Sequence, residues 1–131
     1  LRLMRATEAS LLAGIQAARP GAHTGDIGAA IQEVIEKAGF AVVKSLGGHG
    51  VGDRVHEEPF IANFGRAGTG EELVPGMVLA LEPIATAGKA AVVLAPDGYT
   101  YRTKDGSRSA HYEHTILIEK DGPPLVVTTA S

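Results

Sequence analysis

The sequence predicts an α+β fold, in which two helices cover one face of a mostly antiparallel sheet. Up to Gly39 the apolar residues recur at helical spacing, and after it the chain breaks into short apolar or alternating segments separated by turn residues. With 131 residues, 44% of them hydrophobic, the chain can bury one core. We therefore expect a single domain over residues 1–131.

Two amphipathic helices are predicted, at residues 1–18 and 24–38. The first has a regular apolar stripe: Met4, Leu11, Leu12, Ile15 and Ala18. Thr24 is expected to cap the second helix, with Asp26 in its first turn and Gly39 just beyond its end. For both helices, packing against the core accounts for the pattern without any further role.

Short strands are predicted through the rest of the chain. Residues 77–81 are five apolar residues in a row, as in a buried strand. The segment Pro96-Asp97-Gly98 predicts a hairpin between its flanking strands. Glycine-rich residues 47–59 and residues 60–73 are expected to be loops. The predicted strands are 40–44, 77–82, 91–95, 99–103, 111–119 and 125–128.

Composition narrows the function classes. The chain has no cysteine, so any metal site must use His, Asp or Glu ligands. The net charge of −3, without a basic block, argues against nucleic acid or an anionic membrane surface as a partner. Apolar runs are too short for a membrane span. We expect a cytoplasmic protein.

Three residues far apart in sequence are candidates for one metal site: His49, Glu82 and Glu113. His49 is flanked by glycines, which permit unusual backbone dihedrals and leave room around the imidazole. Glu82 ends a buried strand, where a carboxylate is costly unless it is paired or metal-bound. The alternatives are an ordinary loop histidine, a strand emerging into solvent at Glu82, and a solvated strand face at Glu113.

One histidine and two glutamates are a ligand set suited to Mn, Fe, Co or Zn. His56, seven residues after His49, lies within reach of the opposite side of a small substrate if the segment is extended. Residues 48–53 lack the final glycine of a dinucleotide-binding loop, so that function is not predicted. The combination of the three ligands is the feature that calls for an explanation.

Together these segments resemble the type I methionine aminopeptidases, in order and in spacing, across the whole chain. The Tyr-Glu-His-Thr segment distinguishes them from the related proline-directed peptidases. The resemblance implies the C-terminal half of the pita-bread (creatinase/aminopeptidase) fold, in which two helices cover a curved, mostly antiparallel sheet. The segments that carry it are Gly48–Gly52, His56–Pro59, Pro75–Pro83, Thr103–Asp105 and Ser109–Thr115.

The resemblance implies a metallo-exopeptidase that removes the initiator methionine from nascent proteins with two divalent metal ions (Co, Mn, Fe or Zn). His49 and Glu82 would bind one metal ion, and Glu113 would bridge both. Glu82 would also accept a proton from the attacking water, and His56 would contact the peptide carbonyl. Val55 and Tyr99 stand where the family lines its methionine pocket, although Val55 replaces an aromatic residue.

The family's two aspartate ligands have no counterpart in this chain. We therefore expect it to carry part of the dinuclear site and to be weakly active or inactive alone. Its expected partners are nascent peptide N-termini and either the missing N-terminal half or a second copy. The alternatives are a non-catalytic protein-binding module of the same fold and a proline-directed peptidase. His111 replaces a more usual glutamine, and we expect this change to matter little.

Overall fold

The computed structural model describes residues 2–53, 57–88, 92–94, 101–103 and 107–128. Within these residues two helices come first and ten short strands follow, and the placing of helices before strands is as the sequence predicts. The elements are α1 Arg2–Ala17, α2 Thr24–Lys37, β1 Ala41–Val42, β2 Gly47–Gly50, β3 Glu57–Ala62, β4 Val78–Leu81, β5 Ile84–Thr86, β6 Val92–Leu94, β7 Tyr101–Thr103, β8 Ser109–His111, β9 His114–Leu117 and β10 Leu125–Val126.

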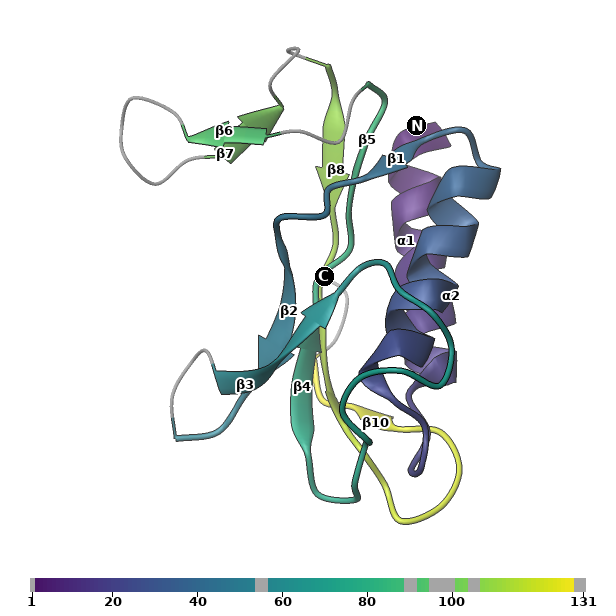
Figure 1. Ribbon diagram of the computed structural model, residues 1–131, viewed down its shortest axis with the longest axis vertical. Coiled ribbons are helices and arrows are strands. Elements are labelled where there is room, and N and C mark those ends of the chain that lie inside the picture. Colours follow the sequence, from purple (N-terminus) through teal and green to yellow (C-terminus); the bar gives the residue numbers. More distant parts are fainter. Residues whose placement is uncertain (1, 54–56, 89–91, 95–100, 104–106, 129–131) are drawn as a thin grey trace.

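The described strands form three antiparallel groups. A five-stranded sheet has the order β10-β9-β4-β2-β3, a three-stranded sheet has the order β1-β5-β8, and β6 pairs with β7. Three stretches of chain pass from one of the larger sheets to the other, through β1–β2, β4–β5 and β8–β9. The two larger sheets are therefore joined along a common line, which lies near the middle of the molecule in Figure 1.

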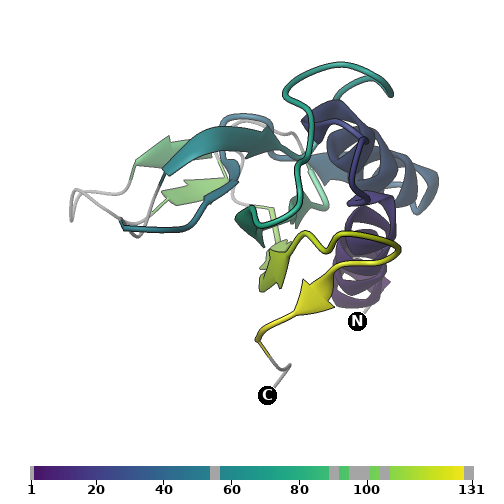
Figure 2. The same ribbon diagram turned by 90° about the horizontal axis from the view of Figure 1, so that it is seen from below.

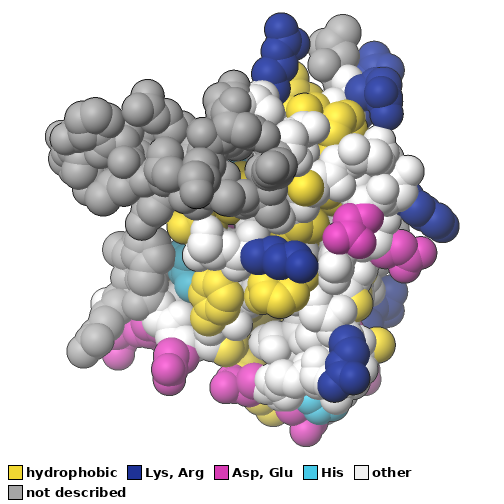
Figure 3. All heavy atoms as spheres, turned by 45° about the horizontal axis from the view of Figure 1, so that its top comes forward, with side chains coloured by type: hydrophobic (Ala, Val, Ile, Leu, Met, Phe, Trp, Pro, Cys, Tyr) yellow, Lys and Arg dark blue, Asp and Glu magenta, His cyan; other side chains and the backbone are white. Residues whose placement is uncertain are grey.

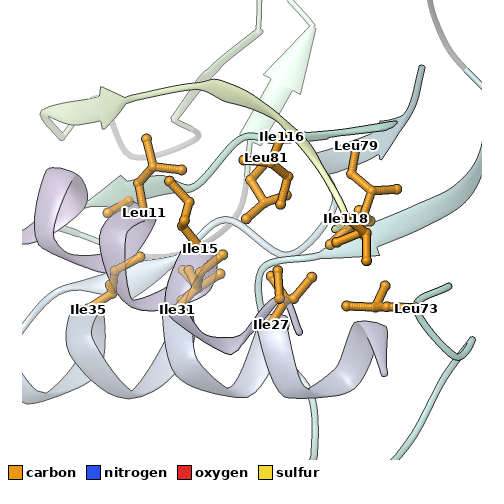
Figure 4. Close-up of a cluster of buried hydrophobic side chains, with 14 of the residues drawn as sticks. Leu11, Ile15, Ile27, Ile31, Ile35, Leu73, Leu79, Leu81, Ile116 and Ile118 are labelled. Carbon is orange, nitrogen blue, oxygen red and sulfur yellow. The ribbon is translucent and has the colours of Figure 1, made fainter. Parts of the chain in front are cut away.

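Helices α1 and α2 lie side by side along one side of the sheets, as Figures 1 and 2 show from two directions. Gly14 lets the helices approach closely, because a Cβ atom there would lie 2.9 Å from Cγ1 of Ile31. The core fills the space between helices and sheet (Figure 4), and its fully buried members from both layers include Leu11, Ile27, Ile31, Ile35, Leu79, Leu81, Ile116 and Ile118. The predicted α+β class, with both helices on one face, is confirmed.

Three details of the sequence prediction are wrong. The cap of α2 is His23, not Thr24, and its N–H donates to a carboxylate oxygen of Asp26 at 2.7 Å. Residues 47–50 and 57–62, expected in loops, form the strands β2 and β3. The predicted strand 111–119 is divided into β8 and β9, which belong to different sheets.

The strand β5 was not predicted, because its three residues directly follow Pro83 and carry no alternation of their own. The predicted strands at 40–44, 77–82 and 125–128 are found, each shorter than expected. The hairpin strands β6 and β7 pair as predicted. Neither described helix has the length and apolar character that a membrane-spanning segment needs.

Replacing Ile31 by alanine tests the helix–sheet core. Ile31 is completely buried in α2, so Ile31→Ala should lower the free energy of unfolding by about 2–5 kcal/mol. Leu12→Ala is the matched control, because Leu12 is 54% exposed on α1 and its truncation should change stability by no more than about 0.5 kcal/mol. Urea unfolding followed by circular dichroism measures both, and equal losses would contradict this packing.

Candidate metal centre

The three predicted ligands lie where the chain crosses between the two larger sheets. His49 is in β2, shortly after the β1–β2 crossing. Glu82 lies between β4 and β5, and Glu113 lies between β8 and β9. The predicted strand 111–119 is therefore interrupted at Glu113, the third predicted ligand.

The sheet register places these side chains on one face. Leu81 pairs with His114 across β4 and β9, and Ile84 pairs with His111 across β5 and β8. Both pairs belong to one continuous register, which also places Glu82 opposite Glu113 between them. His49 pairs with Ala80, two residues before Glu82. Since side chains alternate along a strand, His49, Ala80 and Glu82 share the face opposite Leu79 and Leu81, which belong to the core.

The side chains converge closely enough to hold one ion. Nε2 of His49 lies 2.9 Å from Oε2 of Glu82. One ligand atom from each of His49, Glu82 and Glu113 lies within 4.8 Å of the other two. The side chains of His49 and Glu82 are 13% and 19% exposed, and Glu113 is exposed. The centre is therefore enclosed toward the sheet and open on the side of Glu113.

The orientation of His49 suits a metal ligand. Its Nδ1 lies 2.9 Å from the carbonyl oxygen of Gly50. That carbonyl can only accept, so Nδ1 is the donor in this bond, and Nε2, which lies 2.9 Å from Oε2 of Glu82, is the ring nitrogen that could bind an ion. Metal-binding histidines are commonly oriented by such a bond from the other ring nitrogen.

The glycines around His49 serve close packing of strands rather than unusual dihedrals. Gly48 and Gly50 have no left-handed backbone conformation. A Cβ atom on Gly48 would lie 2.1 Å from the carbonyl oxygen of Ala80, and one on Gly50 would lie 2.3 Å from that of Glu58. The prediction that the glycines frame a site is retained, but its physical reason is corrected.

His111 is a site residue whose importance the sequence did not indicate. Its Nε2 lies 3.6 Å from Oε1 of Glu82, and its side chain is half exposed. Hydrogen bonding to Glu82 raises the pKa of His111 above its ordinary value of 6.5, against an opposing effect of burial and with added attraction from the charges of Glu82 and Glu113. His111 and Glu113 are two residues apart, and that spacing in a predicted strand was the available signal.

A cavity of about 320 Å³ adjoins His49 and Glu82. Apolar side chains from β3, β5 and the β1–β2 crossing contribute to its wall, so it could accept an uncharged side chain. Its lining residues are Ser45, Leu46, Gly47, His49, Phe60, Glu82, Ile84 and His111. The other predicted site residues, Val55, His56 and Tyr99, lie outside the residues that the structure describes.

The donor set fits a divalent cation. It offers one imidazole nitrogen and two carboxylates, the ligands that Mn, Fe, Co and Zn accept in proteins. Glu82 and Glu113 face each other on neighbouring strands, an arrangement in which like charges repel unless a cation lies between them. Among the described residues this is the one group of three or more such side chains close enough to hold an ion.

Comparison with known proteins agrees with this chemistry. Residues 1–120 match the sequence model of metallopeptidase family M24. The chain belongs to this family. It is 47% identical over 125 residues to methionine aminopeptidase A of Synechocystis, an alignment that covers 95% of this chain and 49% of that protein. The predicted resemblance to methionine aminopeptidases is confirmed.

Solved structures confirm the predicted half of the fold. The crystal structure of methionine aminopeptidase from Rickettsia prowazekii matches with a TM-score of 0.94 and 44% identity, over 98% of this chain and 52% of that one. Prolidase from Pyrococcus furiosus matches with a TM-score of 0.68 and 22% identity, over 98% and 32%, which is a likeness of fold alone. The chain spans about half the length of the curated relatives that it matches.

Replacing Gly48 by alanine should damage the metal centre through the sheet. The new Cβ atom would force β2 away from Ala80 and shift His49 relative to Glu82. We expect the Kd for Co(II) to rise at least about 10-fold, with a loss of about 1–3 kcal/mol in stability. Gly39→Ala is the control, since Gly39 has a φ of 89° with open space around it. It should reduce stability and leave the Kd for Co(II) unchanged in a calorimetric titration.

Proposed function

We propose that this chain forms one half of an aminopeptidase that releases N-terminal methionine from nascent proteins, and that it carries part of the metal site. The observation that carries the proposal is the convergence of His49, Glu82 and Glu113 in a chain 47% identical to a methionine aminopeptidase. Substrates of this class become available where proteins are synthesised, so we place the activity in the cytoplasm. Because the chain spans about half of these relatives, the complete activity is part of the proposal.

In this proposal His49, Glu82 and Glu113 are the residues of this chain that would hold the divalent ions. Cobalt, manganese, iron and zinc all suit the donor set. Bound ions of this kind lower the pKa of water and polarise a carbonyl group, which favours hydrolysis near neutral pH. Glu113 is exposed, so the side of the centre that it forms is accessible from outside the chain.

The chain's own residues would bind the peptide and move its protons. Glu82 is held between His49 and His111 and accepts a proton from the attacking water. His56 donates a hydrogen bond to the carbonyl oxygen of the cleaved peptide bond as negative charge develops there. Val55 and Tyr99 form part of the wall around the methionine side chain. The cavity beside Phe60 and Ile84 receives a neighbouring part of the peptide.

The two alternatives have less support. A non-catalytic binding module has no use for a histidine whose Nδ1 is bonded to a carbonyl and whose Nε2 lies beside the carboxylate of Glu82, with Glu113 close to both residues. A proline-directed peptidase is supported by the fold alone, since the prolidase of Pyrococcus furiosus is 22% identical with a TM-score of 0.68. The methionine aminopeptidase of Rickettsia prowazekii has far higher values, 44% and 0.94.

We also propose that a complementary half of the fold completes the centre, and that the chain self-associates without it. On the face in Figure 3 exposed hydrophobic side chains lie among charged ones. Elsewhere three apolar residues at the β10 edge are exposed in succession: Leu125 by 51%, Val126 by 38% and Val127 by 51%. An edge strand with an apolar surface is prone to pair with another chain.

Sedimentation velocity tests this association surface. The chain should sediment faster as its concentration rises, and the double variant Leu125→Lys/Val127→Lys should reduce that dependence, because charged residues on an edge strand oppose pairing. Leu12→Lys is the matched control, since Leu12 is equally exposed on α1, and it should behave like the unmodified chain. A chain that remains monomeric at high concentration would contradict the proposal.

A chimera tests the proposed activity. In it, residues 1–131 replace the matching half of the Rickettsia prowazekii enzyme, and release of methionine from Met-Ala-Ser is assayed with Mn(II) or Co(II). The chimera should be active, and His49→Ala and Glu82→Ala should each lower kcat/KM at least about 100-fold, since loss of a ligand exceeds the effect of losing its supporting groups.

His23→Ala is the control for the chimera, because His23 caps α2 and is not one of the residues that converge at the centre. It should leave kcat/KM unchanged. A folded, metal-loaded chimera whose activity survives both His49→Ala and Glu82→Ala would overturn the catalytic proposal and favour the binding module.

A further inference from the structure

Asn63 is a fully buried polar residue directly after β3. Its side-chain Nδ2 donates a hydrogen bond to the backbone carbonyl of Glu82 at 2.8 Å and lies 3.5 Å from the backbone carbonyl of Leu46. These carbonyls belong to two different crossings between the sheets, β4–β5 and β1–β2. The side chain of Asn63 therefore links the backbone of Glu82 to the segment that leads into β2, the strand of His49.

The sheet is irregular at the place where Asn63 acts. Val42 pairs with Ala85, and His49 pairs with Ala80. His49 lies seven positions after Val42, whereas their partners Ala80 and Ala85 are five positions apart. The β1–β2 crossing is therefore two residues longer than the β4–β5 crossing that it adjoins. Those residues prevent regular pairing beside Glu82. The amide of Asn63 supplies a donor to the Glu82 carbonyl at this place.

The orientation of the carboxamide follows from its neighbours. Both Glu82 and Leu46 present carbonyl oxygens, which only accept hydrogen bonds, so the nitrogen of Asn63 must face them. Its Oδ1 is buried and has no hydrogen-bond partner among the described residues. A buried acceptor without a partner opposes stability. The arrangement is therefore better suited to fixing the two crossings than to stabilising the fold.

We propose that Asn63 is a positioning residue for the metal ligands Glu82 and His49, an inference that rests on the metal centre proposed above. By holding the Glu82 carbonyl, Asn63 fixes the backbone from which the Glu82 carboxylate extends toward His49. By contacting Leu46, it fixes the approach to β2. Asn63 does not touch the proposed ions or the peptide, so it acts on the geometry of the centre.

The test is a Co(II) titration of the complete chain followed by visible absorption. Asn63→Asp keeps the shape of the side chain and removes its donor, and Asn63→Ala removes the carboxamide without adding a charge. Both should raise the Kd for Co(II) about 10–100-fold, the range typical of groups that support metal ligands. The Co(II) absorption bands should also shift, because the ligand geometry changes. Ser10→Ala is the matched control.

Ser10 is also fully buried, and its hydroxyl donates to the Thr7 carbonyl within α1. Its replacement should lower stability while leaving the Kd and the Co(II) spectrum unchanged. Folded Asn63 variants that bind Co(II) with the original Kd and spectrum would overturn the positioning role. Failure of the unmodified chain to bind Co(II) would instead overturn the metal centre itself.

A second measurement does not depend on the variants folding. In the unmodified chain, the side-chain amide resonances of Asn63 should shift in NMR spectra when Zn(II) is added, because Glu82 and its backbone adjust to the ion. Resonances that remain unchanged as Zn(II) binds would overturn the inference.

Discussion

The structure depends on one antiparallel register between the β4–β5 segment and the β8–β9 segment. This register is the same on both sides of the point where the chain passes from one sheet to the other. The β4–β5 and β8–β9 segments keep one register from Val78 opposite Leu117 to Thr86 opposite Ser109. Pro83 has no N–H to donate, and the chain bends there from one sheet into the other. Glu82 and Glu113 face each other at this bend. The register thus creates a pair of carboxylates whose repulsion a divalent cation relieves, and the fold and the metal chemistry share one cause.

Side chains alternate between the two faces of β4, so that one face contributes to the core and the other faces the metal centre. Leu79 and Leu81 contribute to the core beneath the helices, whereas Ala80 and Glu82 face the metal centre. Changes to the centre can therefore alter binding with little loss of core packing. The small side chain of Ala80 and the absent one of Gly48 let β2 and β4 approach closely, which brings His49 near Glu82. Large residues at either position would separate the ligands.

Sequence reasoning was strongest where a pattern is local. Helical spacing located α1 and α2, and the apolar run 77–81 located β4. The candidate ligands His49, Glu82 and Glu113 were selected by residue type and local context, and the structure brings their side chains together. Three features were not predictable, because they arise from pairing between segments distant in sequence. They are the division of the predicted strand 111–119 into β8 and β9, the strand β5, and the linking role of Asn63. The close packing at Gly48 likewise depends on a neighbouring strand.

The exposure of the ligands determines how a substrate can approach. His49 and Glu82 are mostly covered by the sheet, whereas Glu113 and His111 are open to the other side. Three protein ligands on one wall would leave coordination positions free for groups from outside this chain. The cavity beside Phe60 and Ile84 adjoins this open side. In the function that we propose, both the peptide and the complementary half of the fold would therefore meet this chain on the open side, at His111 and Glu113.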